Sequence, residues 1–182
     1  MLSKEQVRKK YFLIRKKKYF NVKNIFFKPL ISIIKKKKIK KISLYYPSNH
    51  EVNTLGLFSI LSSKKNLSIL LPKILKNEEM KLVKYKFLDP LEVNKFGFLE
   101  PKINSKSEIP DLMIVPTLVF DKDHNRLGYG KGYYDKFLSK YVKNKKNILT
   151  IGLAFSFQKY KKLPTSKLDV KLDYILTERG IF

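Results

Sequence analysis

The chain contains no cysteine and no tryptophan, and only four of its 40 basic residues are arginines. Without cysteine, neither a disulfide nor a thiolate metal site can form, and nothing favours export. The longest apolar stretches, such as residues 112–120, fall far short of the roughly 20 residues that a membrane-spanning helix requires. The apolar residues near the N-terminus are scattered, so we expect no secretory signal. These absences lead us to expect a cytoplasmic protein with no membrane partner.

Acidic residues are also few: 15 against 40 basic ones, which gives a net charge of +25. Such a balance is typical of nucleic-acid-binding proteins. Dedicated readers of nucleic acid, however, favour arginine for its planar, bidentate fork. The chain is also rich in Ile, Asn, Phe and Tyr, a mixture typical of A/T-rich codons. We therefore interpret the lysine excess as compositional drift and expect no specific nucleic-acid partner. A basic nucleic-acid-binding protein stays open as an alternative.

A length of 182 residues suits one domain, and 43% hydrophobic residues are enough for a packed core. The pattern predicts a basic helix over about residues 4–28, ended or kinked by Pro29, within a segment (1–41) that holds 16 basic residues and one acid. Further helices are predicted over 52–62 and 132–141. Strands are predicted over 41–46, 67–71 (stopped by Pro72), 81–87, 112–115 (central in the sheet), 148–153 and 174–176.

This alternation of strands and helices indicates an α/β fold. We expect a single three-layer α/β/α domain over residues 1–182, Rossmann-like, around a mostly parallel sheet. In such sheets ligands bind beyond the carboxyl ends of the strands. Polar clusters follow three predicted strands there, at residues 49–51, from 121 onward, and at 156–158.

The most informative stretch is the loop at 126–135, where three glycines (Gly128, Gly130, Gly132) precede a predicted helix. A strand followed by a glycine loop and a helix start lets backbone N–H groups approach a phosphate, and the helix dipole favours its negative charge. Arg126 and Lys131 flank the glycines. The loop matches neither the Walker pattern nor the dinucleotide fingerprint. It therefore predicts binding of a nucleotide or another polyanionic small molecule, without saying which.

The order of residues 120–135, F-D-K-x-x-N-R-L-G-x-G-K-G-Y-Y-D, resembles the motif of the 5-formyltetrahydrofolate cyclo-ligase (methenyltetrahydrofolate synthetase) family. Four other parts of the chain resemble that family, so the likeness covers nearly the whole chain. They are Lys4-x-x-x-Arg8, residues 43–46 followed by Glu51, residues 97–101, and the C-terminal residues 163–164 with 169–173. The chain departs from the common pattern at Thr117 and Tyr129, and residues 73–94 match weakly.

The resemblance implies ATP- and Mg²⁺-dependent cyclisation of 5-formyltetrahydrofolate to 5,10-methenyltetrahydrofolate, with release of ADP and phosphate. The formyl oxygen would be phosphorylated, and N10 would then attack the activated carbon. Such a transfer mainly needs positioning and charge neutralisation, so no catalytic Ser, Cys or His is expected. Arg126 and Lys131 are the implied catalytic residues. The implied ATP-binding residues are Lys4, Arg8, Arg126, Leu127, Gly128, Tyr129, Gly130, Lys131, Gly132, Tyr133 and Tyr134.

The same resemblance implies a folate site and a metal site. The implied substrate-binding residues are Tyr46, Glu51, Tyr129, Gly130, Lys131, Gly132 and Tyr133, with Glu51 accepting hydrogen bonds from the pterin. Asp135 and Asp169 are the implied Mg²⁺ ligands, which suits a metal that takes one or two carboxylates plus phosphate oxygens. Asp173 competes with Asp169 for the second position.

Several of these residues also admit a simpler interpretation. Asp135 would complement the dipole of the helix that follows the loop. Lys4 and Arg8 lie four residues apart on one helical face, and Arg15 falls on the same stripe with its role undecided. His50 and His124 lie in predicted turns and are expected to be solvated. Another small ATP-dependent transferase without the folate pocket is a second alternative, and we expect a monomer.

Overall fold

The computed structural model describes residues 2–77, 79–102, 105–143 and 148–182. A seven-stranded sheet in the order β11–β10–β9–β6–β1–β2–β3 forms its centre. Five neighbouring strands run parallel: β1 (Lys41–Ser43), β2 (Ser68–Ile74), β6 (Leu112–Pro116), β9 (Leu149–Leu153) and β10 (Tyr174–Thr177). The edge strands β3 (Met80–Tyr85) and β11 (Gly180–Ile181) run antiparallel to their neighbours. The expected mostly parallel sheet with a central strand at 112–115 is confirmed.

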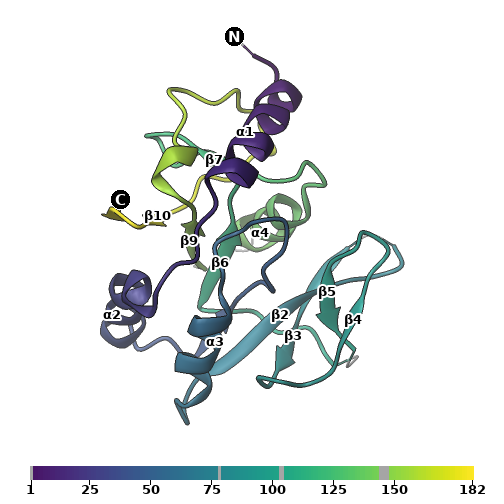
Figure 1. Ribbon diagram of the computed structural model, residues 1–182. Helices are drawn as coiled ribbons and strands as arrows, with labels where there is room; N and C mark the ends of the chain where they lie inside the picture. Colours follow the sequence, from purple (N-terminus) through teal and green to yellow (C-terminus); the bar gives the residue numbers. More distant parts are fainter. Residues whose placement is uncertain (1, 78, 103–104, 144–147) are drawn as a thin grey trace.

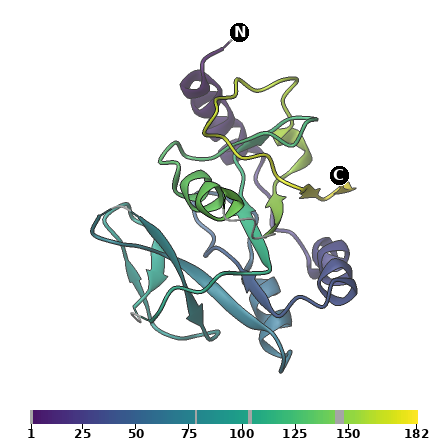
Figure 2. The same ribbon diagram turned by 180° about the vertical axis from the view of Figure 1, so that it is seen from behind.

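Helices cover both faces of this sheet, as Figures 1 and 2 show from opposite sides. The short 3₁₀ helix η1 (Asn24–Phe27), α2 (Lys28–Lys36) and α3 (Leu55–Ser62) share one apolar cluster with Ile114. On the other face, α4 (Tyr133–Lys143) shares a second cluster with Met113. Because neighbouring residues of a strand point to opposite faces, the buried central strand serves both layers. The three-layer arrangement is confirmed.

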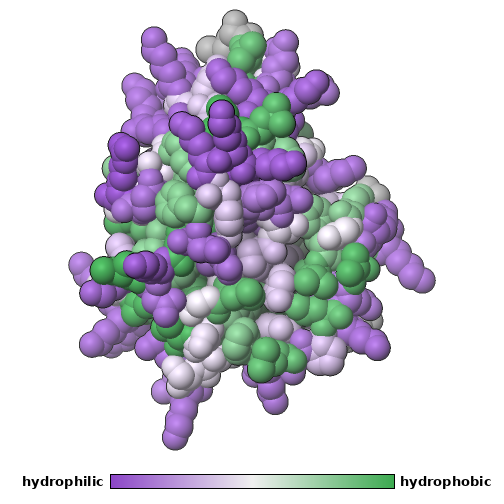
Figure 3. Space-filling model, viewed as in Figure 1, coloured by the Kyte–Doolittle hydropathy of each residue, from purple (hydrophilic) through white to green (hydrophobic). Residues whose placement is uncertain are grey.

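Helix α1 (Lys4–Lys18) packs beyond the carboxyl ends of the parallel strands. Ser3 and Gln6 form a capping box that starts it, which satisfies two otherwise unpaired backbone donors. Its buried residues follow one another at four-residue spacing: Val7, Tyr11 and Arg15. The first two pack on the hairpin β7 (Val119–Phe120) and β8 (Arg126–Leu127). Hydrophilic side chains cover the outer surface of the helix (Figure 3).

Two predicted boundaries are wrong because of prolines. The predicted helix over 4–28 ends at Lys18, and Pro29 lies in the first turn of α2 rather than ending a helix. Proline suits a first turn because its missing N–H would have no helical partner there. Pro72 does not stop β2, which continues to Ile74. Past Leu70 the described sheet pairs β2 with β3 alone, so a proline is tolerated.

The sequence also missed the hairpin of β4 (Leu91–Val93) and β5 (Leu99–Pro101), which projects beside β2 (Figure 1). Bonds to β2 hold it: Ile74 N–H donates to Glu100 Oε2 at 3.0 Å, and Lys73 Nζ donates to both the Pro101 carbonyl and Glu92 Oε1, each at 2.6 Å. The β7–β8 hairpin and the 3₁₀ helix η2 (Ser156–Gln158) were likewise not predicted. None of the described helices is long and apolar enough to span a membrane.

Candidate functional site

A cavity of about 800 Å³ opens at the carboxyl ends of β1 and β6. The chain crosses from β1 to β2 on one side, whereas β6 and β9 follow on the other, so the strand order reverses there. This reversal is where open α/β sheets bind ligands. The start of α1, the segment after β1, the β4–β5 hairpin, residues 126–135, the first turns of α4 and residues 166–169 surround the cavity.

All residues predicted from the sequence to bind ATP, folate or metal line this one cavity. They are Lys4, Arg8, Tyr46, Glu51, every residue from 126 to 135, and Asp169. The cavity therefore joins segments that lie more than 160 residues apart in the chain, such as Lys4 and Asp169. The placement does not itself assign a role to any of them.

The glycine loop has a backbone that other residues adopt only with strain. Gly130 and Gly132 have φ angles of +99° and +70°, in the region open to glycine. Arg8 lies directly on this backbone: its Nε donates to the Gly128 carbonyl at 3.0 Å, and a Cβ on Gly130 would lie 3.4 Å from its Cζ. The loop thus combines exposed backbone with a fixed cation from α1.

Arg126 supplies a second, buried cation at the start of this loop. Only 6% of its surface is exposed, and its Nη2 lies 3.1 Å from Asp135 Oδ1. That approach lacks hydrogen-bond geometry, so Arg126 Nε and Nη2 have no hydrogen-bond partner within the described part of the chain. The guanidinium also lies 5.8 Å from the centroid of the Tyr134 ring. Buried donors without partners are unfavourable, which makes this group a ready partner for an anion.

The two predicted metal ligands belong to segments that contact each other. Val170 N–H, one residue past Asp169, donates to Asp135 Oδ1 at 3.2 Å. Lys4 Nζ contacts Asp169 Oδ2 at 2.5 Å, and Ser166 also donates to that oxygen. Burial alone would raise the pKa of Asp169, but the hydrogen bonds from Lys4 and Ser166 outweigh it and lower the pKa. Asp169 is therefore ionised, as a metal ligand must be.

Asp173, the competitor for the second position, has another role. Its Oδ2 accepts bonds from both the backbone N–H and the hydroxyl of Thr150, each at 2.7 Å. These bonds join the start of β10 to β9, and Asp173 does not line the cavity. No group of three or more His, Cys, Asp or Glu residues gathers as a metal site among the residues that the structure describes. A metal here would have to share its coordination with a ligand.

Glu51 is a buried acid that also lines the cavity, on the segment after β1, and 7% of its surface is exposed. A turn with left-handed residues at Asn49 and His50 precedes it, and Ser48 N–H donates to its Oε2 at 2.9 Å. Burial raises its pKa to about 7. The charge of Arg15, the Ser48 N–H and the Tyr129 hydroxyl act in the opposite direction. An acid with this pKa is poised between its two protonation states near neutral pH.

Arg15, on the same helical face as Lys4 and Arg8, lies beside this acid. Its Nη2 donates to the Tyr129 hydroxyl, and its Cζ lies 5.3 Å from the centroid of the same ring. Unlike Lys4 and Arg8, Arg15 does not line the cavity. The periodicity correctly placed the three residues on one helical face but could not show that the third is buried.

Aromatic rings from the β4–β5 turn form a wall that the sequence did not reveal. The ring centroid of Phe96 lies 5.9 Å from that of Tyr133, and the ring centroid of Phe98 lies 5.9 Å from that of Tyr129. Lys131 Nζ lies 5.1 Å from the Phe96 ring centroid. The sequence signal nearest to them was the segment 97–101 that resembles the family, and in the structure its Gly97 makes the turn with a φ of +80°. Tyr46, on the segment after β1, adds a further ring to the cavity lining. Its ring centroid lies 6.4 Å from that of Phe58.

The remaining sequence predictions concern residues outside the cavity. His50 is exposed and stacks edge-on against Tyr19 at 5.4 Å, while His124 is half-buried. Neither lines the cavity, and Thr117 is buried near Gln158, which donates to its carbonyl at 2.9 Å.

Comparison with known proteins gives a consistent result. A model of the 5-formyltetrahydrofolate cyclo-ligase family matches residues 3–178. The 5-formyltetrahydrofolate cyclo-ligase of Haemophilus influenzae is 33% identical over 152 residues, which cover 80% of this chain and 80% of that protein. That of Mycoplasma pneumoniae is 34% identical over 140 residues, which cover 77% and 74%.

Solved structures agree with the fold. The NMR structure of Aquifex aeolicus 5,10-methenyltetrahydrofolate synthetase has a TM-score of 0.74 at 32% identity, and covers 98% of this chain and 91% of that chain. A 5,10-methenyltetrahydrofolate synthetase from Mycoplasma pneumoniae has a TM-score of 0.72 with 96% and 98% coverage. At 24% identity, the second likeness concerns the fold alone.

Proposed function

Since the chain belongs to the 5-formyltetrahydrofolate cyclo-ligase family and is an ATP-dependent enzyme of that kind, we propose that this cavity binds Mg·ATP and the reduced folate side by side. The nucleotide phosphates would lie against residues 126–135 and the start of α1. The pterin would lie toward Glu51. The observation that carries this proposal is the joining of a cationic, glycine-lined end and a buried acid in one cavity.

The reaction has two bond exchanges. The formyl oxygen attacks the γ-phosphorus of ATP, and the bond to ADP breaks with its electron pair leaving on ADP. N10 of the folate then attacks the formyl carbon, which bears a good leaving group. The C–O bond breaks, phosphate departs with that electron pair, and N10 loses its proton. Both steps need aligned reactants and neutralised charge more than covalent help from the protein.

The nucleotide end supplies that neutralisation. Arg126 has buried donors without partners in the described part of the chain, and Arg8 is fixed over the loop by its bond to the Gly128 carbonyl. Because Arg126 is itself buried, its charge would stabilise a transferring phosphoryl group more strongly than a fully solvated cation would. Lys131, at the exposed rim of the loop, has a long side chain that can reach the same phosphates. We assign Arg126 and Lys131 to the transferring group, and Lys4 and Arg8 to the rest of the triphosphate.

Asp135 and Asp169 suit Mg²⁺, because two neighbouring carboxylates leave room for phosphate oxygens and water. When bound, the metal would supply charge neutralisation at the phosphates. Each carboxylate now contacts a cation: Asp135 contacts Arg126, and Asp169 contacts Lys4. Lys4 and Arg126, which line the same cavity, would neutralise phosphate charge beside the carboxylates. The same four side chains would thus balance charge with and without the nucleotide.

At the folate end, Glu51 would accept hydrogen bonds from the donor edge of the pterin, which requires its ionised form. Tyr46 and the rings of Tyr129, Tyr133, Phe96 and Phe98 would pack on the pterin and aminobenzoyl groups. Neither alternative function, a nucleic-acid-binding protein or a transferase without a folate site, explains a buried acid in this cavity. A single domain, a monomeric state and a cytoplasmic location stay predictions.

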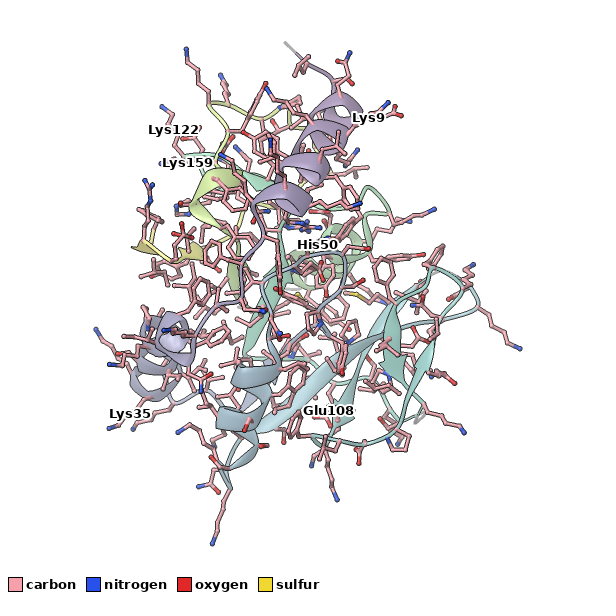
Figure 4. All side chains as sticks on the ribbon, in the orientation of Figure 1. Lys9, Lys35, His50, Glu108, Lys122 and Lys159 are labelled. Carbon is pink, nitrogen blue, oxygen red and sulfur yellow. The ribbon has the colours of Figure 1, made fainter. Side chains whose placement is uncertain are left out.

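The test is turnover of 5-formyltetrahydrofolate with Mg·ATP by the purified protein and two variants. Lys131→Ala and Asp135→Ala are expected to lose most of the methenyl product, measured by its near-ultraviolet absorbance. The matched control is Lys122→Ala, an exposed lysine outside the cavity at the edge of the molecule (Figure 4). Wild-type rates in both site variants would contradict the site assignment, while the control is expected to be unchanged.

A further inference from the structure

Arg15 is the most buried basic residue in the described part of the chain, with 1% of its surface exposed. Its Nε and Nη1 have no hydrogen-bond partner there, and Nη2 donates to the Tyr129 hydroxyl. Arginine is rarely buried unless it is paired, because removing its charge from water is costly. No ion pair with a carboxylate compensates Arg15 among the described residues. A buried cation arranged in this way needs an explanation beyond packing.

The carboxylate on which the charge of Arg15 acts is that of Glu51. Tyr129 lies between the two: its hydroxyl accepts from Arg15 and hydrogen-bonds to Glu51. Arg15 also acts on Glu51 directly through its charge. Three elements meet in this way, since Arg15 belongs to α1, Tyr129 to the glycine loop and Glu51 to the turn after β1. Glu51, at the folate end of the cavity, therefore interacts with a residue of the glycine loop at the nucleotide end.

We propose that Arg15 is a positioning residue which, through Tyr129, holds Glu51 as a carboxylate directed at the pterin and ties that acid to the glycine loop. The proposal rests on the proposed function, because it takes Glu51 as the pterin contact. It gives Arg15 a task different from that of Lys4 and Arg8 on the same helical face. It also gives the Tyr129 hydroxyl a specific role at a loop position where backbone alone would suffice for phosphate binding.

The surroundings of Glu51 show why one cation matters. The groups that face it are Arg15 from α1, Tyr129 from the loop, Tyr134 from α4, and Tyr45 and the Ser48 N–H from its own segment. Burial raises the pKa of all three tyrosines, so they are neutral near neutral pH. Among these groups Arg15 alone carries a charge that opposes the desolvation of Glu51. Without it, the acid would be protonated at neutral pH and would no longer present two acceptor oxygens.

The experiment compares Arg15→Met, Arg15→Lys and Tyr129→Phe with Lys16→Met, an exposed residue on the same helix. Steady-state kinetics are measured for each substrate between about pH 6 and about pH 9.5. For Arg15→Met we expect KM for the folate to rise by about fivefold at neutral pH, because raising the pKa of the acid from about 7 by about one lowers its ionised fraction from about a half to about a tenth. The loss should shrink as the pH rises, and KM for ATP should stay within about twofold.

The other variants separate charge from packing. Arg15→Lys keeps the cation and should restore most of the folate affinity at neutral pH, whereas Tyr129→Phe should give a smaller loss in the same direction. Lys16→Met should resemble the parent. Equal losses for ATP and folate with an unshifted pH profile would overturn the proposal, because a purely structural residue acts in that way. If Arg15→Met does not fold, an unshifted pH profile in Tyr129→Phe would overturn it instead.

Failure of the proposed function would look different. In that case the parent protein itself would give no methenyl product. The link between Arg15 and Glu51 can then be measured without turnover, from the titration of the Glu51 carboxyl carbon by NMR in the parent and in Arg15→Met. We expect the midpoint of the titration to lie higher in the variant by about one pH unit or more. A titration at the same pH in both proteins would overturn the inference whatever the enzyme does.

Discussion

Replacing Glu51 with glutamine should stabilise the fold while removing folate binding. The carboxylate is buried, and burial raises its pKa from an ordinary 4.5 to about 7. A folded protein that holds this proton more tightly than the unfolded chain loses stability as the pH rises through the interval between the two values. The full contribution is present below about pH 4.5 and is lost by about pH 7, where Glu51 ionises in the fold.

The size of the effect follows from that interval. At about 1.4 kcal/mol per pH unit, ionising Glu51 in the fold costs about 3 kcal/mol relative to the unfolded chain. Glutamine has nearly the same shape as the protonated acid and keeps an oxygen that can accept from Ser48 N–H. Glu51→Gln should therefore match the parent near pH 4.5 and exceed its free energy of unfolding by about 3 kcal/mol above pH 8.

Urea unfolding of both proteins at several pH values between about 4.5 and 8.5 measures this difference. The other titrating groups, such as Asp169 and Asp121, are present in both proteins, so their contributions cancel. A difference in unfolding free energy that stays constant with pH would refute the reasoning, because the buried acid would then titrate normally. The same variant should bind folate poorly at every pH, since a neutral amide cannot replace the carboxylate.

Three other changes test separate parts of the site. Arg8→Gln should raise KM for ATP about tenfold with little effect on folate, because a charge-assisted phosphate contact contributes about 1.5 kcal/mol or more; steady-state kinetics with each substrate varied decides it. Gly130→Ala should lower stability by about 1 kcal/mol or more, because its φ of +99° strains any side chain, and thermal unfolding would measure that loss. Asp169→Asn should raise the Mg²⁺ concentration needed for half-maximal rate. It should also remove stability that the parent has above the unfolded pKa and loses as the pH falls through the lowered folded pKa, which acid unfolding would measure.

The sequence was sufficient where short-range pattern decides structure. Alternation of apolar runs with helical spacing predicted the parallel sheet, and the central strand at 112–115 follows from a run that is buried on both faces. The order of Arg126, the glycines, Lys131 and Asp135 predicted that these residues form one ligand-binding loop. These features depend on residues that are close together in the sequence, so they can be predicted from local sequence patterns.

What the sequence could not supply is long-range contact. The pairing of Lys4 with Asp169 and that of Arg15 with Tyr129 join segments more than 100 residues apart. Phe96 and Phe98 line the cavity on a hairpin that Glu100 and Lys73 tie to β2. Pro29 was misread for a related reason: a proline ends one helix or begins the next, and packing decides which.

The central claim is that one cavity holds Mg·ATP and 5-formyltetrahydrofolate together for cyclisation. The most direct test incubates the purified protein with both substrates and follows methenyl absorbance and ADP in the same sample, with Lys131→Ala alongside. We predict equal amounts of methenyl product and ADP, dependence on Mg²⁺, and loss of both signals together in the variant. ADP formed without folate, or no methenyl product under any of these conditions, would contradict the account.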